Sequence, residues 1–223
     1  MYSGNQRQLQ HRIGAAIAGW GILNYRSFPW RYVHDPYRIA VSEILLRRTQ
    51  AAQVSKVYNL IIDKYPSLSV MAHIPDDESL ILSLGLHSRA GILREFAQAT
   101  VDRYGGIVPQ NREELLGLPG LGDYGVSAIR VFAFGYRDPL IDVNTVRIIS
   151  RINGIAYTDS LRRSMKIHSM YSDLVEFQDP VIYGYSILDL GAKICRPVPK
   201  CNLCPLNGMC QYSVESGNAE MGF

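Results

Sequence analysis

The stretch Leu118-Pro119-Gly120-Leu121-Gly122 stands between two segments with helical periodicity, residues 111–117 and 123–134. Pro119 fixes its own φ, whereas Gly120 and Gly122 allow positive φ and the close approach of other atoms. A turn of this kind leaves the first N–H groups of the second helix unpaired, and the helix dipole makes them a site for one phosphate group. The same residues also suit a plain helix–helix turn. They therefore predict a helical hairpin and leave phosphate binding open.

Helical periodicity continues on both sides of this turn. The stretch from about Val41 to Tyr65 carries apolar residues at helical spacing and predicts one long helix or two abutting helices. Turns rich in Pro, Gly and Asp separate the other expected helices, which are residues 78–84, 88–104, 111–117, 123–134, 143–153, 160–177 and 181–194. No segment of convincing length alternates as a strand would. The sequence predicts an all-α protein with about nine or ten helices.

Composition bounds the class of protein. The chain has 223 residues, of which 47% are hydrophobic, so it can bury the core of one or two domains. Its net charge of +3 and its excess of Arg over Lys permit an anionic partner without requiring one. No apolar run approaches 18 residues, and the N-terminus lacks the apolar stretch of a secretory signal. We therefore expect neither a membrane protein nor a secreted one.

All four cysteines lie close together near the C-terminus. Their spacing is Cys195-x5-Cys201-x2-Cys204-x5-Cys210, and the preceding 194 residues contain none. A disulfide scaffold would scatter its cysteines, so the cluster indicates a metal site in a reducing compartment. Four thiolates suit either an iron–sulfur cluster or a tetrahedral zinc ion, and the spacing alone does not separate the two. A structural role is the default expectation.

Asp142 is the second candidate for chemistry. It stands directly before the helical stripe of Val143, Val146 and Ile149, and is first of all expected to be an N-cap. Capping N–H groups also hold a carboxylate ionised, and a fixed anion can stabilise a cationic transition state. The two interpretations are compatible. Arg147, one turn further, suits either a DNA backbone or a solvated helix face.

The combination of a Pro-Gly hairpin, an Asp twenty residues later and four terminal cysteines resembles the helix-hairpin-helix DNA glycosylases of the endonuclease III superfamily. The resemblance runs from about Phe28 to Cys210. It implies a domain of six helices, residues 30–136, that contains the hairpin. It also implies a second helical domain, residues 1–29 and 137–223, that holds a four-iron, four-sulfur cluster, with DNA in the cleft between the domains. This chain has five residues between its first two cysteines where the family usually has six, so zinc stays the alternative.

The residue two positions after Gly122 separates the members of the superfamily. In endonuclease III it is a lysine that attacks the sugar and then cleaves the strand. Here it is Tyr124, and a phenol cannot form a Schiff base. The resemblance therefore implies a monofunctional glycosylase without strong lyase activity, in which water is the nucleophile.

Two monofunctional groups are similar to this chain: the Mig-type glycosylases, which remove thymine opposite guanine, and the MutY-type adenine glycosylases. Arg47-Arg48-Thr49, Ala51 and Tyr124 match the Mig pattern. The glutamine that MutY uses on adenine falls near Tyr185, which is not the aliphatic residue typical of Mig either. The sequence also ends at Phe223, without the further domain by which MutY recognises 8-oxoguanine. We expect a glycosylase that excises thymine and uracil mispaired with guanine in base excision repair; the alternatives are excision of adenine opposite guanine or 8-oxoguanine, and binding without catalysis.

The resemblance also assigns roles to single residues. Asp142, Glu43 and Tyr124 are the expected catalytic residues. Asp142 stabilises the sugar cation and orients water, and Glu43 hydrogen-bonds the leaving pyrimidine or positions water. Tyr124 packs on the sugar or separates the flipped nucleotide from its neighbours. Ala51 and Tyr185 are expected at the base pocket. The expected DNA-binding residues are Arg47, Arg48, Gly120, Gly122 and Arg147, with Arg47 or Arg48 filling the vacated site and hydrogen-bonding the orphaned guanine. Cys195, Cys201, Cys204 and Cys210 are the expected metal ligands. Taken alone, Arg47 and Arg48 would be two surface arginines, and Tyr124 a half-buried aromatic.

The expected partner is double-stranded DNA that contains a mismatch. We expect the protein to be a monomer in the cytoplasm, at the nucleoid, with no membrane association.

Overall fold

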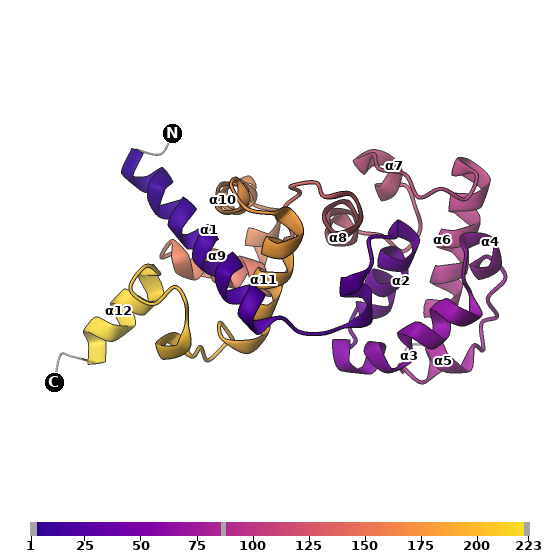
Figure 1. The fold of residues 1–223 in the computed structure, drawn as a ribbon, viewed down its shortest axis with the longest axis horizontal. Helices are drawn as coiled ribbons and strands as arrows, with labels where there is room; N and C mark the ends of the chain where they lie inside the picture. The colour runs from indigo at the N-terminus through magenta and orange to yellow at the C-terminus, as the bar shows by residue number, and fades with distance from the viewer. Residues whose placement is uncertain (1–3, 86–87, 221–223) are drawn as a thin grey trace. The chain divides into compact units, whose positions relative to one another are not determined.

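The computed structural model describes residues 4–85 and 88–220, and within these ranges it contains helices and no strand (Figure 1). The prediction of an all-α protein is confirmed. The chain divides into two compact units, residues 27–136 and residues 1–26 together with 137–223.

The unit of residues 27–136 is built around α2 and α8. Its elements are η1 (Pro29–Tyr32), α2 (Pro36–Leu46), α3 (Ala51–Lys64), α4 (Leu68–Met71), α5 (Ser79–Leu82), α6 (Arg89–Tyr104), α7 (Arg112–Leu116) and α8 (Asp123–Phe134). The start of α2 is fixed by Pro36 and by Asp35, whose Oδ1 accepts a 2.8 Å hydrogen bond from the N–H of Arg38. Helix α2 packs on α8, α6 and α3, and Ile44 and Leu45 are fully buried there. These contacts hold the C-terminal end of α2 beside the hairpin.

The second unit contains both ends of the chain. Its elements are α1 (Gly4–Asn24), α9 (Val143–Ile152), η2 (Asp159–Arg163), α10 (Met165–Val175), α11 (Pro180–Lys193), η3 (Cys201–Leu203) and α12 (Gln211–Glu220). Residues 1–3 and 221–223 of the predicted second domain lie outside the described residues, as do residues 86–87 of the predicted six-helix domain.

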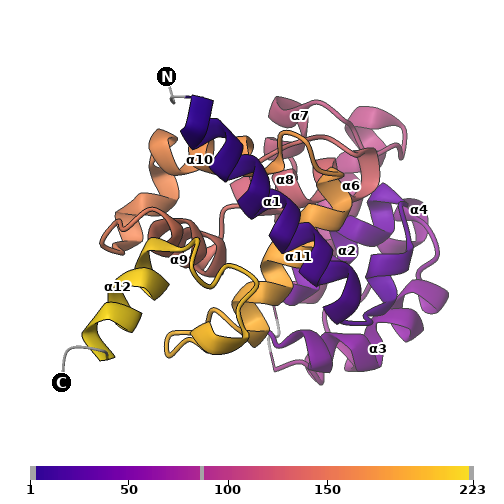
Figure 2. The same ribbon diagram turned by 60° about the vertical axis from the view of Figure 1, so that its left-hand side comes forward.

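Helix α1 crosses and packs against α11 in this unit (Figure 2). A Cβ on Gly21 would fall 1.8 Å from Ser186 Oγ, so the absence of a side chain on Gly21 permits the close approach of the two helices. Just beyond α1, Arg26 forms an ion pair with the fully buried Asp189 of α11. A buried carboxylate without such a partner would be strongly unfavourable. The pair therefore anchors the end of α1 to α11.

The structure corrects several predicted helices. The stretch 41–65 is two helices separated by residues 47–50, and the predicted helix 160–177 is a 3₁₀ turn, η2, followed by α10. The helical periodicity did not predict α1, α4 or α12, so the twelve α-helices of the described residues exceed the nine or ten expected. The sequence of α1 contains several glycines, which lower helix propensity, and its stability comes from packing on α11 and α10.

The described residues include no helix that is both long and apolar enough to cross a membrane.

Candidate active site and nucleic-acid interface

The hairpin between α7 and α8 uses its two glycines differently. Gly120 has φ = +81°, and a Cβ there would lie 2.4 Å from Ile92 Cγ2, so both its backbone conformation and its surroundings require glycine. Gly122 is the exposed N-cap of α8 with φ = −114°, and no described atom lies within 4 Å of where its Cβ would be. The structure also shows no side-chain cap among the described residues at this end of α8. Because glycine has no side chain, the N-cap of α8 offers no acceptor of its own to the first N–H groups of the helix, as a phosphate site requires.

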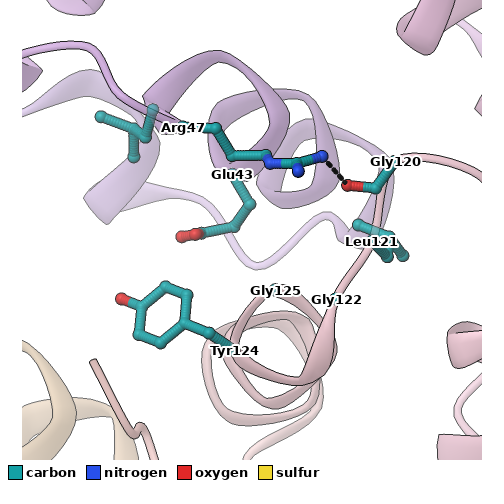
Figure 3. Close-up of a pocket in the computed structure, with 8 residues that line it drawn as sticks. Glu43, Arg47, Gly120, Leu121, Gly122, Tyr124 and Gly125 are labelled. Atoms are coloured by element: carbon teal, nitrogen blue, oxygen red, sulfur yellow. Dashed lines mark hydrogen bonds between the residues drawn. The ribbon is translucent and has the colours of Figure 1, made fainter. Parts of the chain in front are cut away.

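A pocket of about 230 Å³ lies beside this hairpin, within the unit of residues 27–136 (Figure 3). Its walls come from the end of α2 and the start of α8, and the lining residues are Glu43, Leu46, Arg47, Gly120, Leu121, Gly122, Tyr124 and Gly125. The half-buried side chains of Glu43 and Tyr124 enter it from opposite walls. Two of the predicted catalytic residues therefore share one pocket with the hairpin glycines.

Arg47 joins the turn after α2 to the hairpin. Its Nη1 donates a 3.0 Å hydrogen bond to the carbonyl oxygen of Gly120 (Figure 3). The neighbouring Arg48 has φ = +57°, which is the left-handed region that L-residues with side chains seldom adopt. Both arginine side chains are exposed, and Ala51 begins α3 three residues later. The turn thus presents two cations next to the pocket at the cost of a strained backbone.

Asp142 is the N-cap of α9, and this part of the prediction is confirmed. Its Oδ1 accepts a 2.7 Å hydrogen bond from the N–H of Thr145, and its Oδ2 accepts a 2.9 Å bond from Nδ2 of Asn144. The side chain is half-buried. Because both oxygens accept hydrogen bonds from donors at a helix N-terminus, the carboxylate is held in one orientation.

Arg147 is half-buried and engaged inside the protein, and a contact of Arg147 with DNA stays a prediction. Its Nε donates to the carbonyl oxygen of Cys195 at 2.8 Å, and its Nη2 donates to the carbonyl of Gly191 at 3.2 Å and to Asn144 Oδ1 at 2.8 Å. Arg151 likewise donates to the carbonyl oxygens of residues 196 and 197. The last carbonyls of α11 and of the loop after it lack helical partners, and these arginines supply the donors. Arg147 therefore fixes the cysteine loop to α9.

The four cysteines line one pocket, together with apolar side chains from α9, α11 and the C-terminal loops. Their thiols are not disulfide-bonded, and Nη1 of Arg151 lies 3.3 Å from Cys195 Sγ. Burial, and next the other cysteines nearby, raise the pKa of Cys201; the same influences raise the pKa of Cys204 to about 11 despite a backbone hydrogen bond. No group of three or more His, Cys, Asp or Glu in the described ranges has the spacing for a single metal ion. Four thiols in one apolar pocket do fit the ligand set of an iron–sulfur cluster.

Tyr185, predicted at the base pocket, is almost completely buried on α11. Its ring packs edge-on against Tyr25, with 5.9 Å between the ring centroids. The structure therefore shows it as a packing residue of its own unit, and a contact of Tyr185 with a base stays a prediction.

Two residues in these sites were not singled out by the sequence. Asn144 connects Asp142 to Arg147, and its position two residues after a predicted N-cap was the available indication. Arg89, at the start of α6, is 2% exposed and lines a cavity with Arg47 and Arg48. Nothing in its sequence neighbourhood marks Arg89 as buried, because an arginine at a helix start is ordinarily solvated.

Comparison with known proteins places these sites in a family. The family model described as HhH-GPD superfamily base excision DNA repair protein matches residues 41–169, which include the pocket, the hairpin and Asp142. The chain belongs to this superfamily, and the resemblance found from the sequence is confirmed.

Individual relatives show which members of the superfamily this chain is similar to. The chain is 37% identical, over 90% of its own length and 92% of the relative's, to a thymine/uracil-DNA glycosylase of Methanothermobacter thermautotrophicus. It is similar to the solved structure of a thermostable thymine-DNA glycosylase, with a TM-score of 0.88, 33% identity and coverage of 94% of this chain and 99% of the other. The adenine DNA glycosylase of Homo sapiens is 31% identical over 88% of this chain, which spans 38% of that protein.

Proposed function

We propose that this protein hydrolyses the N-glycosidic bond of thymine, and of uracil, mispaired with guanine in DNA. The observation that carries the proposal is similarity along nearly the whole length of a thymine/uracil-DNA glycosylase. The similarity to the human adenine glycosylase is lower and covers only a minor part of that protein. The sequence at Arg47, Arg48 and Tyr124 supports the same choice.

The mechanism begins with extrusion of the target nucleotide, because its glycosidic bond is out of reach inside a duplex. A T·G wobble pair is less stable than a correct pair, which lowers the cost of extrusion. The exposed Gly122 and the uncapped start of α8 bind one backbone phosphate. Arg47 or Arg48 fills the gap and donates hydrogen bonds to O6 and N7 of the orphaned guanine. That DNA lies between the two units stays a prediction.

Bond cleavage is then assisted by carboxylates. Glu43, in the pocket wall, hydrogen-bonds the leaving pyrimidine or positions water. Asp142 stabilises the positive charge that develops on the sugar and orients the attacking water. Two donors hold Asp142 in place, so its carboxylate needs little reorganisation during the reaction. Tyr124 packs on the sugar and cannot form a Schiff base, so we propose base release without strand cleavage.

We further propose that Cys195, Cys201, Cys204 and Cys210 hold a four-iron, four-sulfur cluster. The support is their shared apolar pocket and the hydrogen bonds from Arg147 and Arg151 to the loop that carries Cys195. The cluster would stabilise the C-terminal part of the second unit. We expect purified protein to absorb near about 400 nm, as iron–sulfur proteins do. If the purified protein contains zinc and lacks this absorption band, the four cysteines hold zinc and the cluster proposal is overturned.

A panel of mismatched duplexes tests the function. Duplexes with T·G, U·G, A·G, A·8-oxoguanine and correct pairs are incubated with excess enzyme, and alkali then cleaves any abasic site. We expect cleavage of the T·G and U·G strands after alkali and intact strands without it. Removal of adenine but not thymine would overturn the proposal in favour of the adenine alternative, and binding without any release would overturn it in favour of a binding module.

A further inference from the structure

A second cavity lies at the start of α6, in the unit of residues 27–136. Its volume is about 250 Å³, and its lining residues are Ile44, Arg47, Arg48, Ser88, Arg89 and Ile92. Three of these six residues are arginines, and the described lining contains no carboxylate. This concentration of positive charge is unusual for a protein wall, because each cation raises the energy of the others.

Arg89 is the decisive residue in this wall. It is 2% exposed, and its Nη1 and Nη2 are buried without a hydrogen-bond partner among the described residues. Burial lowers the pKa of Arg89, and the nearby Arg47 lowers it further. A buried guanidinium normally has an acid or several acceptors beside it, because the desolvation of an unpaired charge is strongly unfavourable. An absent anionic group would account for this arrangement.

The start of α6 provides further donors at the same place. Ser88 is the N-cap and Arg89 the first residue of this 16-residue helix. Within the part of the chain that the structure describes, the N-cap makes no side-chain hydrogen bond and the first turn contains no acidic residue. Its first N–H groups and its dipole therefore also favour an anion. Asp76, which lies near Gly91, is already paired with Arg94 at 2.8 Å.

We propose that this cavity binds one phosphodiester group of the DNA backbone, with Arg89 in its wall and, at its rim, whichever of Arg47 and Arg48 does not contact the orphaned guanine. A phosphate supplies both the negative charge and the acceptor oxygens that the buried guanidinium lacks, whereas a neutral base edge would supply acceptors only. The cavity adjoins the hairpin, because Arg47 and Ile92 in its lining both contact Gly120, but its phosphate is a different one from the phosphate at Gly122 and the start of α8. This inference rests on the proposed action on DNA.

The test compares variants of Arg89 in their binding to a duplex with 2′-fluorothymidine opposite guanine, which resists hydrolysis. Arg89→Leu removes the charge, Arg89→Lys retains it, and Lys56→Gln is a control that removes one exposed charge from α3. We expect Arg89→Leu to make the negative slope of log K against log[salt] shallower by about 0.9. The affinity at low salt should fall about tenfold. Arg89→Lys and the Lys56 control should keep the slope.

Stability provides the second readout. Because no described residue pairs with the buried Nη atoms of Arg89, Arg89→Leu should leave the thermal midpoint unchanged or raise it. A lowered midpoint would show that Arg89 is paired within the fold and would overturn the proposal. An unchanged salt slope in Arg89→Leu would also overturn the proposal. If the slope is unchanged but the variant no longer prefers guanine opposite the target, Arg89 contacts the base instead.

Neutral methylphosphonates placed one at a time along both strands locate the phosphate. We expect one position at which the methylphosphonate weakens binding by the wild type but does not further weaken binding by Arg89→Leu. Absence of such a position would overturn the inference. Thymine excision by the same wild-type preparation is measured on unmodified T·G duplex. If excision fails while the slope still depends on Arg89, the proposed function fails and the phosphate site stands.

Discussion

The two hairpin glycines give the sharpest test of how this protein binds DNA. Alanine at Gly120 should lower the stability of the fold, whereas alanine at Gly122 should lower the affinity for DNA. At Gly120, alanine must adopt φ = +81° and place its Cβ 2.4 Å from Ile92 Cγ2. The left-handed conformation costs about 1–2 kcal/mol, and overpacking of this kind costs about 1–3 kcal/mol. We expect Gly120→Ala to destabilise the protein by about 3 kcal/mol, a large part of the roughly 5–15 kcal/mol that holds a typical domain folded.

Gly122→Ala is the matched variant in the same turn. Its Cβ meets no described atom within 4 Å, and φ = −114° suits any residue. Alanine is a poorer N-cap than glycine but reduces the entropy of the unfolded chain, so the two effects nearly cancel and the stability should change by less than about 0.5 kcal/mol. The new methyl group instead occupies the space through which a phosphate reaches the N–H groups of α8. We expect DNA affinity to fall about tenfold.

Thermal unfolding followed by circular dichroism measures the first effect, and fluorescence anisotropy of a labelled T·G duplex measures the second. Gly120→Ala should lower the midpoint by roughly 10 °C for a chain of this size, whereas Gly122→Ala should leave it in place. If Gly122→Ala binds the duplex as tightly as the wild type, DNA does not approach this turn, and the proposed phosphate grip is refuted.

Three further substitutions test the site. Tyr124→Lys places an amine where the lyases of the superfamily have one, and we expect an adduct with the T·G strand that borohydride traps; its absence would count against the placement of residue 124 beside the sugar. Arg48→Gly removes the strain of a side chain at φ = +57° and should stabilise the protein by about 1 kcal/mol. It should also reduce the preference for guanine opposite the target, and an unaltered preference would show that another residue recognises the guanine. Asn144→Ala removes the donor to Asp142 Oδ2 and should slow single-turnover excision about tenfold at unchanged DNA affinity; an equal rate would show that Thr145 alone orients the carboxylate.

Local patterns predicted much of the fold. The helix starting at Val143 and its Asp142 cap depend on neighbouring residues, and so does the hairpin; the structure contains all of these. The periodicity did not predict helix α1, because the stability of this helix depends on contact with α11, where Gly21 allows close packing. Such a contact joins residues far apart in the sequence and leaves no periodic pattern of its own.

The sites likewise contain features that the sequence predicted and features that depend on contacts between distant residues. The pocket shared by Glu43, Tyr124 and the hairpin was expected from the resemblance, whereas the internal partners of Arg147 were not. Two of these partners are carbonyl oxygens about 45 residues away in sequence. The burial of Arg89 likewise follows from the packing of α6 against α2, which no single stretch of the sequence specifies.

Single-turnover excision of thymine from a T·G duplex by Asp142→Asn tests the central claim most directly. Asparagine caps a helix about as well as aspartate, so the fold and DNA binding should persist, and Asp159→Asn is a control at an exposed acid of the same unit. The account predicts that Asp142→Asn lowers the rate constant at least about 100-fold, because the developing charge on the sugar loses its anion, while the control retains the wild-type rate. Excision by Asp142→Asn at the wild-type rate would contradict the account.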